Sequence, residues 1–324
     1  MPIKFIIITG PTATGKTSLG VNIALNFNGE IISADSRQVY IGLDIGTGKD
    51  LSEYSKEGQH IPYHLIDTID PKEVYNLRQF NYDALRKIKE ISDNNKLPIM
   101  VGGTPLYIDS IISKYKFPLP PPDHFLRQNI KDKSAEEIAS YLKEYHLEHY
   151  NQLENKLSRP RLVRLLEEIE LKNRSQTYFQ SLDLEYDFLI LAPFYDRKEV
   201  HNRIEQRLDE RLKNGMVEEV DKLHSQGVSW EKLDSFGLEY RYITQFLLHE
   251  LSYSEMRNAL LAKIRQFARR QDVWFRKMEK EGHNIYWLPK GDLSEASELI
   301  NFFLTDIAMP LPKIKISEIY YGKK

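Results

Sequence analysis

A short segment near the start of the chain has the residue types of a phosphate-binding loop. The pattern G-x-x-x-x-G-K-[ST] is matched by Gly10-Pro11-Thr12-Ala13-Thr14-Gly15-Lys16-Thr17. An apolar, β-branched run precedes this P-loop and a helical pattern follows it, which is a context that a chance Gly-rich turn lacks. Backbone N–H groups and the helix N-terminus favour an anion there. We therefore expect a polyphosphate ligand, with Lys16 reaching its terminal oxygens and the Thr17 hydroxyl binding Mg²⁺.

Two further polar segments follow predicted strands. Ser33–Tyr40 carries Asp35, whose carboxylate could hold an incoming nucleophile or accept its proton. The alternative for Asp35 is an Asx turn or a helix N-cap, and the residue types alone leave both open. Val101–Tyr107 is a second Gly-rich loop, a pattern that also suits a plain tight turn.

A motor-type ATPase would also need an apolar strand that ends in Asp and holds Mg²⁺. The nearest match is His64-Leu65-Ile66-Asp67, and its apolar run is short. This argues against a motor-type ATPase.

The elements that must position these residues alternate between strand and helix, as in a doubly wound parallel sheet. The predicted strands are Phe5–Thr9, Glu30–Ala34, His64–Ile69, Pro98–Val101 and Asp187–Pro193, with helices over Lys16–Phe27 and Leu77–Ser92. Ligands of open α/β sheets bind at the carboxyl ends of the strands. The P-loop, Asp35 and the second Gly-rich loop are all expected at that edge.

The Pro-rich segment 117–122 interrupts this alternation, and charged helical segments follow it. We therefore expect an α/β fold in which a P-loop NTPase-like parallel sheet core carries an inserted helical module and C-terminal helices. The expected divisions are 1–116 for the first part of the core, 117–186 for the module, and 187–324 for the rest. Two long amphipathic helices are predicted in the last part, over Arg197–Gln226 and Ser254–Lys280.

The first of these helices places like charges on one face. Arg203, Arg207 and Arg211 are spaced i, i+4, i+8, an arrangement that an anion would relieve. The alternative is neutralisation by Glu199 and Glu210 on the same helix.

The second helix combines an apolar stripe with basic flanks. The stripe expected to be buried comprises Leu260, Ile264, Phe267, Gln271, Trp274 and Met278. The flanks carry Lys263, Arg270 and Lys277 on one side and Arg265, Arg269 and Arg276 on the other. Charge runs are usually solvated faces, but here cations greatly outnumber acids, which favours an RNA backbone.

The composition limits the chemistry. The 324 residues are 41% hydrophobic and allow a large core, and a pI near 6.5 excludes a uniformly basic RNA coat. The absence of Cys excludes thiolate metal sites and Cys nucleophiles, and the nine His residues show no metal-type spacing. No apolar run approaches the roughly 20 residues that span a bilayer. We expect a cytoplasmic protein with no membrane partner.

Taken together, the segments resemble the ordered signature blocks of the tRNA dimethylallyltransferase family. The similarity runs from Thr9 to about Trp287. No single block except the P-loop is specific to the family, but the number, order and spacing of the blocks are. The blocks are Gly10–Thr17, Ile32–Tyr40 with Gly42-Leu43-Asp44-Ile45-Gly46-Thr47, His64–Asp67, Val101–Tyr107 and Gln266–Arg276.

The resemblance implies a transfer of a dimethylallyl group from its diphosphate to N6 of the adenosine 3′-adjacent to the anticodon of tRNA. Lys16, Thr17 and Asp35 would be catalytic, with Mg²⁺ on Thr17 and the anticodon stem-loop as partner of a monomer. The diphosphate would bind to the P-loop, and we expect Arg203 and Arg207 to bind it as well. The expected tRNA contacts are Asp35, Ser36, Arg37, Gln38, Thr104, Arg127, Pro160, Arg161, Leu162, Val163, Arg164, Arg269 and Arg270.

The chain departs from the family pattern at three places. The family usually has Gly where this chain has Pro105, Gln where it has Pro160, and a Gly-Tyr pair where it reads Gly237-Leu238-Glu239-Tyr240. These departures concern local RNA contacts and leave the catalytic blocks intact.

Two other classes share some of these features. A nucleotide or small-molecule kinase would also have a P-loop and an acceptor-holding Asp35, but a large helical module and a basic helix are superfluous for a small acceptor. An RNA-binding ATP switch should have a convincing strand that ends in a Mg²⁺-binding Asp, and none is found.

Overall fold

The chain forms two compact units in this computed structural model. The core unit comprises Met1–Lys114 and Leu182–Lys324, and the helical module comprises Tyr115–Ser181. The structure describes residues 2–56, 58–115, 117, 123–153, 156, 158–172, 182 and 184–319. The predicted module extended to residue 186, whereas the structure assigns 182–186 to the core unit, because Tyr186 begins a strand of the sheet and pairs with Ile3.

A six-stranded parallel sheet is the centre of the core unit, which confirms the predicted fold class. Its order is β5-β2-β6-β1-β7-β8. The strands are β1 Ile3–Ile8, β2 Gly29–Ser33, β5 Tyr63–His64, β6 Leu97–Val101, β7 Tyr186–Phe194 and β8 Ile285–Pro289. A small antiparallel hairpin, β3 Ser55–Lys56 with β4 Gln59–His60, lies outside this sheet.

The predicted strand His64–Ile69 is wrong beyond its first residue. Only Tyr63 and His64 pair with β2. Leu65 and Asp67 have φ angles of 61° and 51°, and this left-handed backbone cannot continue a strand. Ile69 returns only as an isolated bridge to Tyr40.

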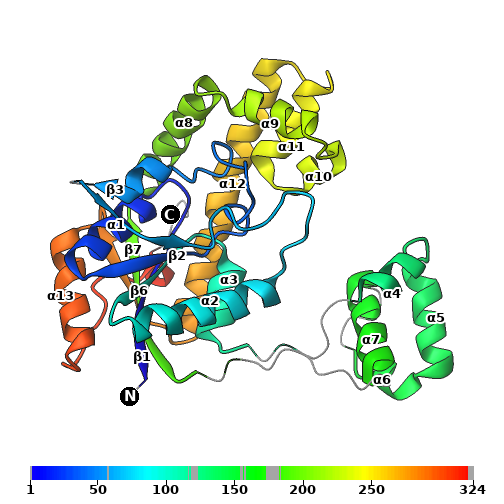
Figure 1. Cartoon of the computed structure of the whole chain (residues 1–324), viewed down its shortest axis with the longest axis horizontal. Helices are drawn as coiled ribbons and strands as arrows, with labels where there is room; N and C mark the ends of the chain where they lie inside the picture. Colours follow the sequence, from blue (N-terminus) through cyan, green and yellow to red (C-terminus); the bar gives the residue numbers. More distant parts are fainter. Residues whose placement is uncertain are drawn as a thin grey trace. The chain divides into compact units, whose positions relative to one another are not determined.

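Helices cover both faces of the sheet, which explains why the central strand β1 is apolar from Phe5 to Ile8 (Figure 1). Phe5 and Ile7 of β1 pack on one face with α2 Leu77–Asp93, α3 Pro105–Ile112 and the end of α12 Tyr253–Lys280. Ile6 and Ile8 point to the opposite face, where α1 Lys16–Asn26 and α13 Leu293–Leu304 pack. Successive side chains of a strand alternate between faces, so a strand buried on both faces has no polar position.

A second helical layer packs beside the sheet. It contains α8 Arg197–Lys213, α9 Met216–Ser225, α10 Trp230–Ser235, α11 Leu238–Leu247 and the first half of α12, around one apolar cluster. The helix predicted over Arg197–Gln226 is two helices, because the chain turns at Gly215, whose φ is 97°. Glycine adopts that left-handed conformation without steric cost. The helix predicted over Ser254–Lys280 is confirmed as α12.

The helical module has its own apolar core. Its helices are α4 His124–Asn129, α5 Ala135–Tyr145, α6 Leu147–Asn151 and α7 Arg159–Lys172. Ile138, Leu142, Leu162 and Ile169 are among its buried residues. Ser134 and Glu137 form a capping box at the start of α5, which satisfies two backbone N–H groups that the helix leaves open.

The described helices include none that is long and apolar enough to cross a membrane. Short 3₁₀ turns occur at Leu51–Tyr54 (η1) and Ile316–Glu318 (η2).

Candidate functional site

Three loops meet at the carboxyl edge of the sheet. β6 lies between β1 and β2, and Val101 is in register with both Ile8 and Ser33. The P-loop follows β1, Asp35 follows β2, and Gly102 begins the loop between them. The sheet therefore brings together segments that are distant in sequence, as the strand pattern predicted.

The P-loop is wound as an anion-binding turn. Gly10, Ala13 and Gly15 have φ angles of 140°, 63° and 79°. Ala13 is a non-Gly residue in left-handed backbone, an uncommon arrangement that the loop must stabilise. The Thr14 hydroxyl donates to the Pro11 carbonyl over 2.8 Å and fixes the turn internally. Backbone N–H groups in such alternating conformations can converge on an anion.

Lys16 lies at the start of α1 with its ammonium facing the P-loop. It donates to the Pro11 carbonyl over 2.8 Å. Burial, reinforced by the positive charge of Arg207, lowers the pKa of Lys16 to about 7, although Asp35 opposes the shift. A bound anion would favour the charged form, because it supplies the opposite charge that the site lacks.

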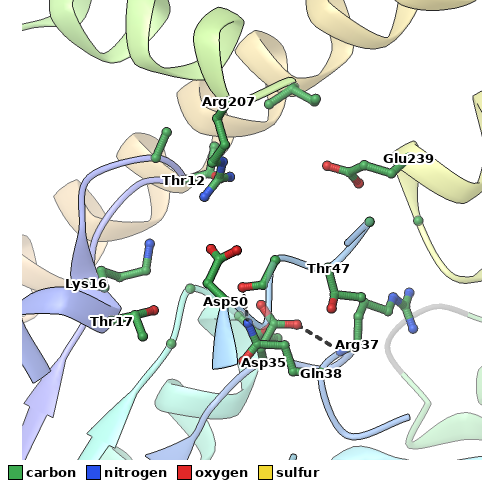
Figure 2. A pocket seen from close by; sticks show the side chains of 18 of the residues that line it. Thr12, Lys16, Thr17, Asp35, Arg37, Gln38, Thr47, Asp50, Arg207 and Glu239 are labelled. Atoms are coloured by element: carbon green, nitrogen blue, oxygen red, sulfur yellow. Dashed lines mark hydrogen bonds between the residues drawn. The ribbon is translucent and has the colours of Figure 1, made fainter. Parts of the chain in front are cut away.

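Asp35 forms the Asx turn that was one of the two alternatives left open by its sequence. Its Oδ1 accepts the Arg37 backbone N–H over 2.8 Å, which is an Asx turn (Figure 2). Among the described residues no hydrogen bond is formed with its other carboxylate oxygen. Asp35 also lines the cavity that the P-loop opens into. The turn thus orients a carboxylate that still has an oxygen for a ligand.

The residues around Asp35 hold its loop in place. The Thr104 hydroxyl accepts the Ser36 backbone N–H over 3.1 Å. Gln38 accepts from the Ser33 hydroxyl over 2.9 Å and donates to the Gly48 carbonyl over 3.0 Å. Thr104 and Gln38, both predicted to contact tRNA, therefore have positioning contacts within the chain.

Glycine is required at the end of β6. A Cβ at Gly102 would lie 2.2 Å from the Ala34 carbonyl oxygen, which is a backbone atom that cannot move aside. The second Gly-rich loop is thus a close approach of two strand ends, which brings Thr104 to the loop of Asp35.

Gln271 of α12 joins the P-loop to this second loop, a role that the sequence alone did not indicate. Its Oε1 accepts the Thr12 N–H over 2.9 Å, and its Nε2 donates to the Gly103 carbonyl over 2.8 Å. The side chain is 2% exposed. A polar residue within an otherwise apolar predicted stripe was the available signal, because a buried amide must find partners.

The three arginines of α8 do not act as one group. Arg203 Nε donates to the Ala13 carbonyl over 2.7 Å, and Arg207 donates to the Thr12 hydroxyl. Arg211 instead lies 3.9 Å from the Asp50 carboxylate. Burial, with the nearby charge of Arg211, lowers the pKa of Arg207 to about 9. Within the described part of the chain no ion pair joins these arginines to the acids of their own helix.

These groups surround one cavity of about 570 Å³. Figure 2 shows Lys16 and Thr17 at one side, Arg207 above, Asp35 and Asp50 in the middle, and Glu239 on the opposite side. Burial raises the pKa of the Glu239 carboxyl, although Arg211 and Arg207 oppose the shift. The cavity therefore has a cationic wall beside the P-loop and a wall with carboxyl groups facing it.

The loop 42–49 forms part of this cavity, and a side chain of helix α9 holds it in place. Glu219 of α9 accepts three backbone N–H groups, those of Asp44, Ile45 and Gly46, over 2.9, 2.5 and 3.0 Å. It also accepts the Tyr240 hydroxyl over 2.7 Å. The sequence alone gave no sign of this role for Glu219, because only the fold brings α9 to this loop.

A buried lysine anchors the other end of that loop. Lys49 is 1% exposed, and its ammonium contacts the carboxylates of Asp44 and Asp67 and donates to the Tyr40 carbonyl over 2.8 Å. Asp67, the weak candidate for a Mg²⁺-binding Asp, is thus an ion-pair partner of Lys49. The His64–Asp67 block has a structural contact that its sequence did not reveal.

Several residues of the predicted tRNA block of the helical module make contacts within the module. Leu162 and Val163 are buried in the module core, so their side chains are not available for the predicted RNA contacts. Arg127 and Arg164 contact Glu167, which is fully buried, at 2.6 and 3.2 Å. Pro160 lies in the first turn of α7, where a missing N–H costs little. Arg161 is exposed.

Pro105 has a similar explanation. It lies at the start of α3, and proline favours a first helical turn because its fixed φ suits the helix. This departure from the family pattern therefore leaves the helix intact.

The stripe of α12 needs one correction. Phe267 was expected in the core, but it is 38% exposed and lines the cavity, whereas Phe275 is fully buried. Arg269 and Arg270 are exposed, as expected for a basic outer face.

Among the described residues no cluster of three or more His, Asp or Glu side chains could hold a metal by itself. A Mg²⁺ ion bound through a phosphate does not need such a cluster, because it keeps several waters and takes few protein ligands. The Thr17 hydroxyl lines the cavity beside Lys16, and its hard oxygen suits that ion.

The parallel sheet with a P-loop after its central strand defines a P-loop α/β protein. A family model described as IPP transferase matches residues 38–278. The chain therefore belongs to the IPP transferase family.

Similar proteins cover almost the whole chain. It is 42% identical over 304 residues to tRNA dimethylallyltransferase 1 of Geotalea uraniireducens (strain Rf4), covering 93% of this chain and 98% of that protein. It is 43% identical over 303 residues to tRNA dimethylallyltransferase 1 of Azobacteroides pseudotrichonymphae genomovar. CFP2, covering 92% and 97%.

Solved structures show the same fold. The full-length tRNA isopentenylpyrophosphate transferase of Bacillus halodurans superposes with a TM-score of 0.67 at 28% identity, covering 94% of this chain and 96% of that one. A eukaryotic dimethylallyltransferase acting on tRNA superposes with a TM-score of 0.74 at 24% identity, covering 96% and 81%. The second likeness concerns the fold alone.

Proposed function

We propose that the protein transfers a dimethylallyl group from dimethylallyl diphosphate to N6 of the adenosine 3′-adjacent to the anticodon of tRNA, and releases pyrophosphate. The observation that carries the proposal is a single cavity lined both by the P-loop after β1 and by a carboxylate, Asp35, at the carboxyl end of β2. The similarity to proteins named tRNA dimethylallyltransferase selects this reaction among those that such a cavity could serve.

The donor diphosphate would bind at the cationic side of the cavity. The P-loop N–H groups, Lys16, Arg203 and Arg207 offset the negative charge that grows on the leaving group. Thr17 would hold Mg²⁺, which neutralises further charge on the diphosphate. Stabilisation of this kind acts on the transition state, because the charge develops as the C–O bond breaks.

Asp35 would act on the acceptor. The N6 lone pair of adenine is delocalised into the ring, so the amine becomes acidic only as its bond to the allylic carbon forms. In the proposed step the N6–C bond forms, the allylic C–O bond breaks with its electron pair leaving on pyrophosphate, and one N6 proton passes to Asp35. A carboxylate held by an Asx turn is suited to this work.

Contacts with tRNA would come from cations of the core unit and of the helical module. We assign this role to Arg37, Arg161, Arg269 and Arg270, and to the helical module as a whole. Phosphate contacts fix position, and the cavity would select the base. A tRNA substrate further favours a cytoplasmic location.

The test is incubation of unmodified tRNA with dimethylallyl diphosphate, Mg²⁺ and the protein, followed by mass analysis of the nucleosides. The expected product is an adenosine heavier by one dimethylallyl group, with one pyrophosphate released per transfer. ATP should not be consumed. Phosphorylation of a small acceptor, with no prenylated nucleoside, would establish the kinase alternative instead.

A further inference from the structure

The wall of the cavity opposite the P-loop carries groups that the proposed reaction has not used. Glu239 lies in the first turn of α11 and faces the cavity (Figure 2). Arg211 of α8 lines the same wall. One side chain can accept hydrogen bonds and the other can only donate them.

Both groups have unused hydrogen-bonding capacity. Arg211 Nη2 is buried and has no hydrogen bond among the described residues, since the Asp50 carboxylate lies 3.9 Å away. Glu239 forms no ion pair and no side-chain hydrogen bond within the described part of the chain, although the charges of Arg211 and Arg207 and its own backbone N–H favour its charged form. A buried polar group without a partner is costly, so the buried Arg211 Nη2, together with a half-buried Glu239 that has no side-chain hydrogen bond, points to a ligand.

Arg211 can occupy this position only because residue 48 is a glycine. A Cβ at Gly48 would lie 1.4 Å from Arg211 Nη2 and 2.5 Å from its Cζ. Any other residue at 48 would therefore displace the guanidinium. Its φ of 62° also favours glycine, so both the backbone and the space depend on this residue.

The charge of this wall argues against a second phosphate. Asp50, Glu53 and Glu239 all line the same cavity. Burial raises the pKa of Glu53 and the charge of Asp50 adds to the shift, so further negative charge is disfavoured. The wall suits a neutral ligand that presents both hydrogen-bond donors and acceptors.

We propose that Arg211 and Glu239 recognise the adenine base of the acceptor nucleotide. Arg211 donates to a ring nitrogen beside the amine, N1 or N7, and Glu239 accepts the N6 proton that is not transferred to Asp35. This inference rests on the proposed function, because it concerns the same acceptor. It makes the wall opposite the P-loop the part of the cavity that determines base specificity.

Such a pair would exclude other bases through unmade hydrogen bonds. Guanine presents a carbonyl where adenine presents its amine, so Glu239 would face an oxygen instead of a donor. A site built to bond a polar group rejects ligands that lack it far more strongly than an apolar pocket can.

The test compares wild-type protein with Arg211→Met on anticodon stem-loop RNAs that carry adenosine, 1-deazaadenosine or 7-deazaadenosine at the acceptor position. Both analogues keep the reacting amine and lack one ring acceptor. Wild-type kcat/KM should fall roughly 10- to 100-fold for one of the two analogues, the worth of a hydrogen bond to a charged donor. Arg211→Met should lower kcat/KM for adenosine by a similar factor and show no further loss with that analogue.

Two matched variants keep the result free of folding effects. Gly48→Ala removes no polar group, yet it should displace Arg211 and abolish the discrimination between adenosine and the deaza analogue. In an Arg211→Met background, Gly48→Ala should cause no further loss of kcat/KM. Glu239→Gln keeps a hydrogen-bond acceptor and should retain more activity than Glu239→Leu. Thermal melts identify any variant that is unfolded, and the KM for dimethylallyl diphosphate should stay unchanged in all of them.

The outcomes separate this inference from the proposed function. Equal penalties for both analogues in wild type and in Arg211→Met would overturn the base-recognition role while transfer itself persists. No prenylated adenosine from the wild-type protein with any RNA would overturn the proposed function.

Discussion

The cavity-lining residues can also be divided by origin, into a strand-end wall of residues that follow strands and a helical wall of residues from helices, and the two are built in different ways. The P-loop, Asp35 and Gly102 follow consecutive or neighbouring strands, and the parallel sheet alone brings them to one edge. Arg203, Arg207, Gln271 and Glu239 come from helices α8, α12 and α11, whose positions depend on the packing of a separate apolar cluster. The strand-end wall carries the P-loop and the proposed base Asp35. The helical wall supports the P-loop, adds positive charge for the donor diphosphate and is proposed to select the acceptor base. A change in either wall should therefore have a distinct kinetic signature.

Asp35→Asn should give the largest effect and act on the chemical step. Asn keeps an oxygen that can accept the Arg37 N–H, so the Asx turn should survive, but it cannot take a proton. We expect kcat to fall by roughly 10²–10⁴-fold, the usual contribution of general-base catalysis. Single-turnover measurements with saturating substrates check this.

The kinetic pattern decides the role of Asp35. Donor KM and thermal stability should be nearly unchanged in the Asn variant. A normal kcat with a raised KM for tRNA would make Asp35 a binding residue and would remove the difference proposed between the walls.

The strand-end wall could be predicted from sequence because its signals are local. The P-loop pattern, the carboxylate after β2 and the glycines after β6 each lie within a few residues of a recognisable strand. Phe5–Thr9 is recognisable by its continuous apolar run, which a strand buried on both faces requires. The strand expected at His64–Ile69 failed because positive φ angles at Leu65 and Asp67 leave no trace in a hydrophobic pattern.

The helical wall could be predicted only in part. The spacing of Arg203, Arg207 and Arg211 placed them on one face, but it could not show that two reach the P-loop while the third packs on Gly48. Glu219 and Lys49 could not be recognised because their partners are distant in sequence or defined by turns. Leu162 and Val163 belong to a block that resembles an RNA-binding segment, yet helical periodicity turns them inward.

Gln271→Leu should have the next largest effect and act on the donor. It leaves the Thr12 N–H and the Gly103 carbonyl without their partner, at about 1–3 kcal/mol for each buried group. We expect a lower melting temperature and a donor KM raised by roughly tenfold, because the P-loop loses its support from α12.

Two variants sharpen this prediction. Gln271→Glu keeps the acceptor for Thr12 and should lose less donor affinity than Leu. Gln266→Leu changes an exposed position of the same helix and should leave both quantities unchanged. Equal donor KM values for Gln271→Leu and wild type would show that the helical wall does not support the P-loop.

The pKa of Lys16 predicts a pH dependence of donor binding. Its folded pKa is about 7 without a ligand, and a bound diphosphate favours the ammonium. Above that pH the free protein must take up a proton to bind, so affinity should fall with rising pH by up to about tenfold per unit. Below it Lys16 is already charged and contributes no slope.

Calorimetry in buffers of different ionisation enthalpy measures this uptake directly. At about pH 8, where the diphosphate itself is ionised, binding of a non-reactive donor analogue should take up close to one proton. Lys16→Ala should bind more weakly and with a flat pH profile over the same range. Proton uptake that persists in Lys16→Ala would assign the titration to another group.

The smallest effect is expected from the outer face of α12, which belongs to neither wall. Arg269 and Arg270 are exposed and lie beyond the residues that line the cavity. If they bind tRNA phosphates, replacing both by Ala should raise the KM for tRNA several-fold and reduce the slope of log KM against log salt by about 0.7–0.9 for each phosphate that is no longer neutralised. The donor KM and the single-turnover rate at saturating tRNA should not change, because neither wall is altered. A salt slope unchanged by the double variant would assign this face to ordinary solvation and leave the RNA contacts to Arg37, Arg161 and the rest of the helical module.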